Sequence, residues 1–271
     1  MKAIFYVCCC IALISCKGNT NNDNNNIVDT TLMSGIQAPA VLTYRVIAQH
    51  PHDETAYTQG LQMYQGKMYE GTGDFENSSL RITDYKTGKV EFKHMMGTKD
   101  IFGEGVTILH DTLYQLTWQN NIVYVYSLKD LTKPIKTFKW PYEGWGITNN
   151  GTDLIISDGV NPNLYFVDPA TFKIKSTVGV ADNNGPVYEI NELEYVDGYV
   201  YANKYTTNVI LKIDPVSGHV VGIMHFDNLL PENEKKAGVT DYFNGIAYDS
   251  TSKTFFITGK RWPKLYEIQI N

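Results

Sequence analysis

The chain has 271 residues, of which 43% are hydrophobic and 19% are charged, and its formal net charge is −6 at pH 7. This composition is that of an ordered globular protein of one or two domains, and it excludes a disordered chain. The acidic balance excludes the basic surface that binding to nucleic acid or to an anionic membrane requires. The chain has 19 Tyr, 11 Phe and 22 Gly and no long run of helix formers at helical spacing, which predicts an all-β fold.

The first 15 residues have the pattern of an export signal. Lys2 is followed by an apolar run at positions 3–14 that is too short to cross a bilayer as a helix. The Leu-Ile-Ser sequence before Cys16 resembles the lipobox of bacterial lipoproteins, in which the signal is removed and the cysteine is lipidated. We therefore expect a signal peptide at 1–15 and an exported lipoprotein of the bacterial cell envelope, facing the periplasm or the surface. The alternative is an ordinary signal peptide followed by a chance cysteine.

A polar segment follows the predicted lipid attachment site. Positions 17–26 contain no apolar residue, so this segment can bury nothing and is expected to be flexible. We assign 16–40 to a lipid-anchored tether and 41–271 to the folded domain. The other three cysteines lie at positions 8–10, inside the predicted signal, so the mature chain has only Cys16 and no intrachain disulfide.

A pair of short strand patterns recurs five times after the tether. The first strands of these pairs are aligned on Gln59, Glu104, Trp145, Asn191 and Asn244, at successive offsets of 45, 41, 46 and 53 residues. The second strands are predicted at 67–70, 112–116, 153–156, 199–202 and 254–257. A period slightly above forty residues, made of short strands and turns, is typical of β-propeller blades. The sequence therefore predicts a five-bladed β-propeller.

The two ends of the predicted propeller complement each other. The last blade ends at 265–270 with three strands, whereas 43–47 is a strand that precedes the first blade. We expect this N-terminal strand to close the ring as the missing outer strand of the last blade. The extra length at 227–240 predicts an insertion that is helical in part.

The aligned positions predict a ring of side chains around the propeller axis, because the innermost strand of each blade lines the central channel. Repeated environments favour one residue type, but these five positions hold four types, which indicates a ligand site. The glycine that follows four of them is explained by close approach of the strands. A second tier is predicted at the ends of the next strands and comprises Trp118, Asp158, Asn203 and Lys260.

Glu104 is the candidate general acid or base of this ring. It lies between Gly103 and Gly105, which leave room for a ligand, and an aromatic setting raises the pKa of a carboxyl group. Lys260 follows an apolar strand, although a lysine is more often solvated. Asp158 is equally compatible with a turn, and we interpret it as structural. Trp118 and Trp145 are either walls of the site or core residues.

Metal and nucleophile motifs are not found in the sequence. The six histidines are scattered, and the pair at His50 and His52 has no third ligand nearby, so we expect no catalytic metal. The chain has no phosphate-binding glycine loop and no nucleophile elbow, which leaves covalent catalysis unsupported.

Nine short segments, taken together, resemble the plant- and bacterial-type glutaminyl cyclases, a family of five-bladed propellers. The match extends over nearly the whole chain after the tether. Examples are Tyr-Thr-Gln-Gly-Leu at 57–61, Phe-Gly-Glu-Gly-Val-Thr at 102–107 and Glu-Gly-Trp-Gly-Ile-Thr at 143–148. The others are 115–118, 156–159, 191–195, 201–203, 244–248 and 257–263.

The resemblance implies conversion of an N-terminal glutamine to pyroglutamate with loss of ammonia and without a cofactor. Glu104 is then the proton shuttle between the α-amine and the leaving ammonia. Lys260, with Gln59 or Asn191 as a further donor, stabilises the oxyanion. The substrate partners implied are peptides or proteins with an N-terminal glutamine.

The same resemblance assigns the walls of the substrate pocket. Trp118 and Trp145 hold the glutamine side chain in a folded conformation, and Phe102 and Tyr57 complete the apolar lining. The family has a tryptophan shortly after the stretch at 201–203, where this chain has Tyr205, so we expect Tyr205 to substitute for it.

Two other function classes stay open at this stage. A lactonase-like hydrolase propeller requires calcium held by several carboxylates at the channel mouth, and the predicted ring holds few. A non-catalytic propeller, tethered to the membrane, would bind a peptide end without turnover. In each case we expect a monomer with no nucleic-acid partner, in contact with the membrane only through the lipid on Cys16.

Overall fold

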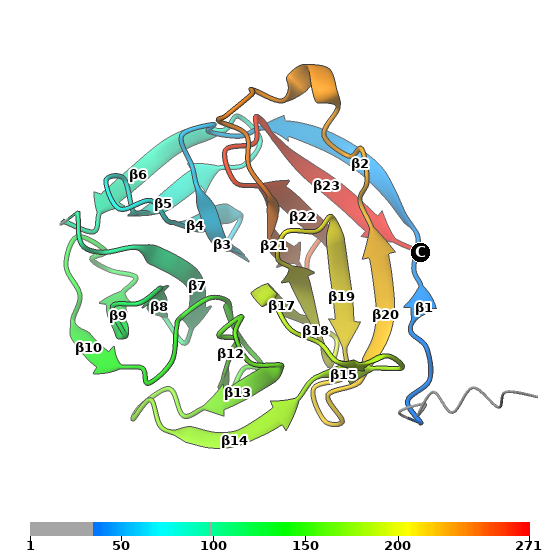
Figure 1. Cartoon of the computed structure of the whole chain (residues 1–271). Helices are drawn as coiled ribbons and strands as arrows, with labels where there is room; N and C mark the ends of the chain where they lie inside the picture. The colour runs from blue at the N-terminus through cyan, green and yellow to red at the C-terminus, as the bar shows by residue number, and fades with distance from the viewer. Residues whose placement is uncertain (1–34, 98) are drawn as a thin grey trace, which may run out of the picture. The chain divides into compact units, whose positions relative to one another are not determined.

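Five antiparallel sheets surround a common axis in the computed structural model, which describes residues 35–97 and 99–271 (Figure 1). The predicted signal peptide, Cys16 and residues 17–34 of the predicted tether lie outside the described residues. No helix in the described part of the chain combines the length and the apolar character needed to span a bilayer.

Each sheet is one blade of a propeller, and its strands follow one another from the axis to the periphery. Blade 1 comprises β3 (Thr58–Tyr64), β4 (Lys67–Thr72), β5 (Ser79–Asp84) and β6 (Lys89–Met95). Blade 2 comprises β7 (Gly103–Leu109), β8 (Thr112–Thr117), β9 (Ile122–Ser127) and β10 (Lys136–Lys139). Blade 3 comprises β11 (Ile147–Asn149), β12 (Leu154–Ile156), β13 (Asn163–Val167) and β14 (Ile174–Gly179).

The last two blades are completed by strands from the start of the described chain. Blade 4 comprises β17 (Ile190–Val196), β18 (Tyr199–Lys204), β19 (Val209–Ile213) and β20 (Val220–His225), to which β1 (Ala40–Val41) adds a parallel strand. Blade 5 comprises β21 (Phe243–Asp249), β22 (Thr254–Gly259), β23 (Lys264–Ile270) and β2 (Tyr44–Pro51). A small ribbon of β15 (Ala181–Asp182) and β16 (Gly185–Pro186) precedes blade 4.

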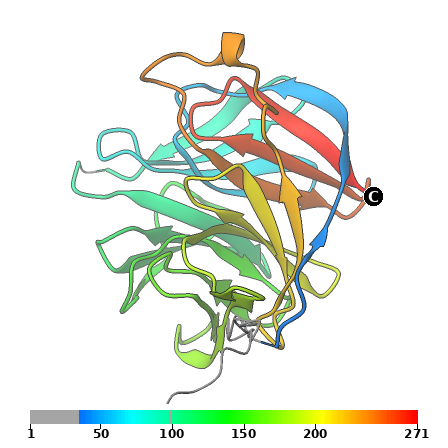
Figure 2. The same ribbon diagram turned by 45° about the vertical axis from the view of Figure 1, so that its right-hand side comes forward.

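The ring is closed as the sequence predicts. Strand β2 pairs antiparallel with β23, from Tyr44 opposite Ile270 to Pro51 opposite Lys264 (Figure 2). The outermost strand of the last blade therefore comes from the beginning of the propeller. This pairing leaves β23 without a free edge, which protects the ring from opening and from edge-to-edge association. The all-β, five-bladed prediction is confirmed.

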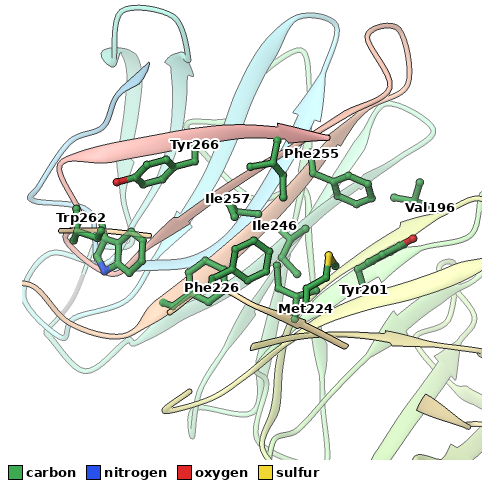
Figure 3. Close-up of a cluster of buried hydrophobic side chains, with 13 residues drawn as sticks. Val196, Tyr201, Met224, Phe226, Ile246, Phe255, Ile257, Trp262 and Tyr266 are labelled. Atoms are coloured by element: carbon green, nitrogen blue, oxygen red, sulfur yellow. The ribbon is translucent and has the colours of Figure 1, made fainter. Parts of the chain in front are cut away.

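The hydrophobic core lies between neighbouring blades. Strand side chains alternate between the two faces of a sheet, so each blade presents one apolar face to the blade before it and one to the blade after it. Figure 3 shows one such cluster, in which Tyr201 and Met224 of blade 4 face Phe255 and Ile257 of blade 5. At about 25 cal/mol per Å² of buried apolar surface, these clusters are the main source of stability for the described residues.

The insertion before β21 contains less helix than the sequence predicts. It holds one 3-10 turn, η1 (Glu232–Glu234), which begins after Pro231. The residues on both sides of this turn, Pro231 with ψ 145° and Lys235 with ψ 133°, have extended backbone, which ends the helical geometry there.

Close contact between inner strands explains the glycines that follow the aligned positions. A Cβ atom on Gly60 would lie 2.5 Å from the backbone nitrogen of Val106, and one on Gly146 would lie 2.0 Å from the carbonyl oxygen of Asn191. No side chain fits at such distances, so these residues are structural, as predicted.

Glu192 occupies the corresponding position in blade 4, where the other four blades have glycine, and its role is not predicted from the sequence. Its Oε1 accepts a hydrogen bond from the Leu61 N–H at 3.1 Å, and its Oε2 accepts one from the Ile246 N–H at 2.8 Å. Burial raises the pKa of Glu192 well above its ordinary value. The side chain therefore links three inner strands, β17, β3 and β21, next to the residue that lines the pocket in β17.

Candidate active site

All nine residues that the sequence analysis assigns to catalysis or substrate binding line one cavity of about 250 Å³. They come from every blade or from the segment leading into it: Tyr57, Gln59, Phe102, Glu104, Trp118, Trp145, Asn191, Tyr205 and Lys260. Because each blade contributes at least one of them, the site is complete only when the ring is closed.

The cavity lies at the end of the ring where the inner strands begin, which we call the pocket end. Tyr57, Phe102 and Trp145 precede inner strands, whereas Trp118, Tyr205 and Lys260 follow the strands next to them. Because neighbouring strands are antiparallel, the start of one and the end of the next lie at the same end of the blade.

β-bulges bend the inner strands at most of the aligned positions, among them the three inner-strand residues that line the cavity. The pairing registers shift across Gln59 in blade 1, Glu104 in blade 2, Asn191 in blade 4 and Asn244 in blade 5. A bulge bends a strand and changes the direction of a side chain, and bulges are common beside active sites. Four of the five aligned positions therefore share a backbone device that the sequence pattern does not reveal.

Glu104 is the buried carboxyl group of the cavity, with 4% of its surface exposed. Burial raises its pKa well above the ordinary value, the Lys260 charge opposes this rise, and the Glu143 charge adds to it. Gln59 Nε2 donates a hydrogen bond to Glu104 Oε1 at 3.0 Å. Glu104 thus has a fixed position and a raised pKa, which suits a group that accepts and returns a proton.

Lys260 is the buried cation of the cavity, with 2% of its surface exposed. Its Nζ lies 4.8 Å from the ring centroid of Tyr57 and 4.7 Å from that of Tyr205, which stabilises the charge by cation–π attraction. Burial lowers the pKa of Lys260, and Glu104 and Asp241 oppose this shift. Tyr57 is held in turn by a hydrogen bond of 3.0 Å from its hydroxyl group to Asp241 Oδ2.

Comparison with known proteins adds to this geometry. The family model for glutamine cyclotransferase matches residues 10–270. The chain belongs to the glutamine cyclotransferase family. It is 40% identical over 230 residues to the glutaminyl-peptide cyclotransferase of Arabidopsis thaliana, covering 83% of this chain and 70% of the relative. The glutaminyl cyclase of Myxococcus xanthus, a solved structure, superposes with a TM-score of 0.78 at 32% identity, covering 86% of this chain and 98% of that chain.

Tyr205, which the resemblance led us to expect in place of a family tryptophan, also lines the cavity. The Tyr205 ring meets the Trp145 ring edge to face, with centroids 5.2 Å apart and an interplanar angle of 83°. Tyr205 thus occupies a wall position, and its ring is one of the two that lie against the Lys260 ammonium group.

Three other predicted ring residues do not line the cavity. Asn244 Nδ2 donates to the Thr58 carbonyl at 3.0 Å, and Asn203 Oδ1 accepts from the Gly245 N–H at 2.8 Å, so both residues bind backbone groups. Asp158 accepts hydrogen bonds from the backbone of Val160 and Asn161, which is the turn role that the sequence allowed. The prediction that the second tier converges on the ligand is therefore wrong for Asn203, whereas Asp158 has the structural role that the sequence favoured.

Glu143 is a residue of the site that the sequence analysis missed. Its Oε2 accepts hydrogen bonds from both indoles, at 2.7 Å from Trp118 Nε1 and 3.0 Å from Trp145 Nε1, and Oε1 accepts one from Gln119. Burial acts to raise its pKa, but these hydrogen bonds lower it overall. One carboxylate therefore fixes the orientation of two cavity walls. The sequence signal is weak, because a glutamate two residues before a tryptophan has no special spacing.

We expect Glu143→Ala to lower kcat/KM for a glutaminyl peptide roughly 10- to 100-fold, because both indoles lose their acceptor and the bound substrate loses its alignment. Loss of the negative charge should also lower the pKa of Glu104 and move the acid limb of the pH profile to lower pH. Steady-state kinetics from pH 5 to 10 checks both effects. Gln119→Ala is the matched control, because it removes one hydrogen bond to Glu143 and leaves both indole bonds. An unchanged pH profile with unchanged kcat/KM would refute this role.

Proposed function

We propose that this protein converts the N-terminal glutamine of peptides to pyroglutamate and releases ammonia. The observation that carries the proposal is the presence of a buried carboxyl group of raised pKa and a buried lysine of lowered pKa on one aromatic cavity. The names of the relatives from Arabidopsis thaliana and Myxococcus xanthus support the same reaction.

In the proposed reaction, the neutral α-amine attacks the side-chain amide carbon of the same glutamine, and a carbon–nitrogen bond closes a five-membered ring. Glu104 as carboxylate takes a proton from the attacking nitrogen. It gives that proton to the amide nitrogen as the carbon–nitrogen bond of the old amide breaks, so that ammonia leaves. The carboxylate is regenerated, and no further reactant is needed. A raised pKa suits this role because the same group must act as base and then as acid.

The oxygen of the amide carries negative charge in the tetrahedral intermediate. Lys260 supplies a positive charge on the cavity surface. Gln59 supplies an amide NH2 group, which has two N–H donors and uses one of them to bind Glu104. Such donors stabilise charge strongly where water is excluded. Asn191 Oδ1 is buried and has no hydrogen-bond partner among the described residues, so it can accept one from the substrate amine or amide.

Ammonia release from a glutaminyl dipeptide by the full-length protein in detergent, with and without excess chelator, tests the proposal against its rivals. We expect release that the chelator does not affect, accompanied by loss of the free α-amine. A folded protein that binds the dipeptide without releasing ammonia would favour the peptide-binding module. Release of ammonia that requires calcium would favour a metal-dependent enzyme. Among residues 35–97 and 99–271 there is no group of three or more His, Cys, Asp or Glu placed to hold a metal ion.

We also propose that the enzyme is a monomer anchored in the bacterial cell envelope by a lipid on Cys16. The support for the anchor is the sequence alone, because these residues lie outside the described part of the chain. The support for a monomer is that one chain supplies the whole lining of the cavity. Labelled palmitate should be incorporated into the wild type and not into Cys16→Ser, and sedimentation in detergent should give the mass of one chain. Equal labelling of both proteins would contradict the anchor.

A further inference from the structure

The exposed aromatic side chains of the protein gather at one end of the ring. Phe75, Tyr142, Tyr188 and Tyr242 are the exposed Phe, Tyr or Trp side chains of residues 35–97 and 99–271. Phe75 lies between the second and third strands of blade 1, and the other three lie in segments that lead into the inner strands β11, β17 and β21. All of these segments are at the pocket end, because they lie before an inner strand or after the strand next to one.

The exposed aliphatic side chains follow no such pattern. Val46 and Ile47 lie on outer strand β2, Val221 lies on outer strand β20, and Val216 lies between the last two strands of blade 4, at the opposite end. Single exposed apolar residues need no explanation, but exposed rings that pack against the walls of a cavity indicate contact with a ligand.

Two of the four aromatic residues extend the walls of the cavity outward. The Phe75 ring lies 5.2 Å from the Phe102 ring and 6.3 Å from the Trp118 ring, between centroids. The Tyr242 ring lies 5.3 Å from the Tyr205 ring. Phe75 is 46% exposed and Tyr242 is 44% exposed, so each has one part against a cavity wall and another part in solvent. We call these two residues the aromatic rim.

The volume of the cavity determines which part of a peptide substrate can contact this rim. A volume of about 250 Å³ is below the roughly 300–1,000 Å³ of pockets that enclose a drug-sized ligand. It accommodates one glutaminyl residue, and the polypeptide that follows has to leave through the mouth. The second residue of a peptide substrate is therefore the first that can contact the rim.

The charged groups beside Phe75 are already paired. Asp74 Oδ2 forms an ion pair of 3.0 Å with Arg261 Nη2, and the Arg261 guanidinium lies 5.3 Å from the Tyr57 ring centroid. A charged substrate side chain would compete with this pair, whereas an apolar one would bury the exposed parts of the rim.

We propose, on the basis of the proposed function, that the aromatic rim is a subsite for the second residue of the substrate and selects apolar or aromatic side chains there. The enzyme thereby discriminates among N-terminal glutaminyl peptides by the residue after the glutamine. Burying an aromatic side chain against a ring of this rim should change kcat/KM by about tenfold.

The test compares kcat/KM for glutaminyl-phenylalanine amide with that for glutaminyl-glycine amide, using the full-length protein in detergent. In the wild type we expect the ratio to be about ten in favour of the phenylalanine peptide. In Phe75→Ala and in Tyr242→Ala the ratio should fall, and in the double variant it should approach one. Tyr142→Ala is the matched control. Its ring is exposed at the same end but stacks on Tyr165 at 4.8 Å, so the ratio should stay as in the wild type.

A wild-type ratio near one, or a ratio that the double variant does not change, would overturn the subsite. A ratio that falls equally in Tyr142→Ala would also overturn it, because loss of any exposed ring at the pocket end would then have the same effect. Calorimetric affinities of both peptides for Glu104→Gln give the same comparison without turnover. Absence of ammonia from both peptides would count against the proposed function, whereas equal affinities of both peptides would count against the rim.

Discussion

Replacement of Glu104 by glutamine is expected to lower kcat by about 10² to 10⁴-fold, the usual contribution of a positioned acid or base. Glutamine has nearly the same shape, and its Oε1 can still accept the hydrogen bond from Gln59, so the thermal midpoint should change little. The variant cannot carry a proton from the attacking amine to the leaving nitrogen. Ammonia release under saturating peptide measures the loss.

The pH profile separates a chemical role of Glu104 from a packing role. Because burial raises the pKa of Glu104, the fraction present as carboxylate grows as pH rises through that value, and kcat/KM should rise with it. In Glu104→Gln this part of the acid limb should disappear, which leaves only the ionisation of the substrate amine. Glu91→Gln, which changes an exposed carboxylate on outer strand β6, is the control. Activity in Glu104→Gln equal to that of this control would remove Glu104 from the mechanism.

Replacement of Lys260 by methionine is expected to lower kcat/KM by about 10² to 10³-fold, the typical loss when one oxyanion donor is removed. Methionine keeps most of the length of the side chain and can fill the space between the Tyr57 and Tyr205 rings. Folding should therefore be retained, because the variant removes a charge that was costly to bury. Steady-state kinetics with a glutaminyl peptide measures the effect.

The alkaline side of the profile provides a second measurement for Lys260. Burial lowers its pKa below 10.5, so the cation is lost, and activity falls, as pH rises through that lowered value. Lys260→Arg keeps a positive charge at these pH values, and its alkaline limb should move to higher pH or vanish. If the wild type and Lys260→Arg have the same alkaline limb, the titration of Lys260 does not control the rate.

The periodicity of the sequence predicts the blade number because each blade repeats the same strand alternation and turn chemistry. Positions such as Gln59, Glu104 and Asn191 are equivalent in the repeat, so a purely local pattern places them at the same height on the axis. The strand at the beginning of the propeller and the missing strand at its end are likewise visible in the sequence. The pairing of Tyr44 with Ile270 and of Pro51 with Lys264 confirms that the first of these strands completes the last blade.

Trp118, Tyr205 and Lys260 meet the inner-strand residues at the cavity. For two of them, Trp118 and Tyr205, the expectation of a place in the cavity wall depends on the family resemblance. The tryptophan of the family is the ground for expecting Tyr205 in a wall, and the resemblance favours a wall over a core position for Trp118. By themselves, the residues favour a turn role for Asp158 and leave Asn203 eligible for the site. The tertiary structure excludes Asn203, because its side chain binds the backbone of Gly245, and it shows Asp158 in its own turn.

Composition, period and strand order were therefore determined by the sequence alone, because they depend on interactions within a blade and between neighbouring strands. The direction of each site side chain depends on bulges, on contacts between blades and on partners far away in the chain. Glu143 is one example, because it stands two residues before Trp145 but reaches Trp118 only where blades 2 and 3 pack side by side. The same holds for the shifted pKa values of Glu104 and Lys260, whose cause is burial by all five blades.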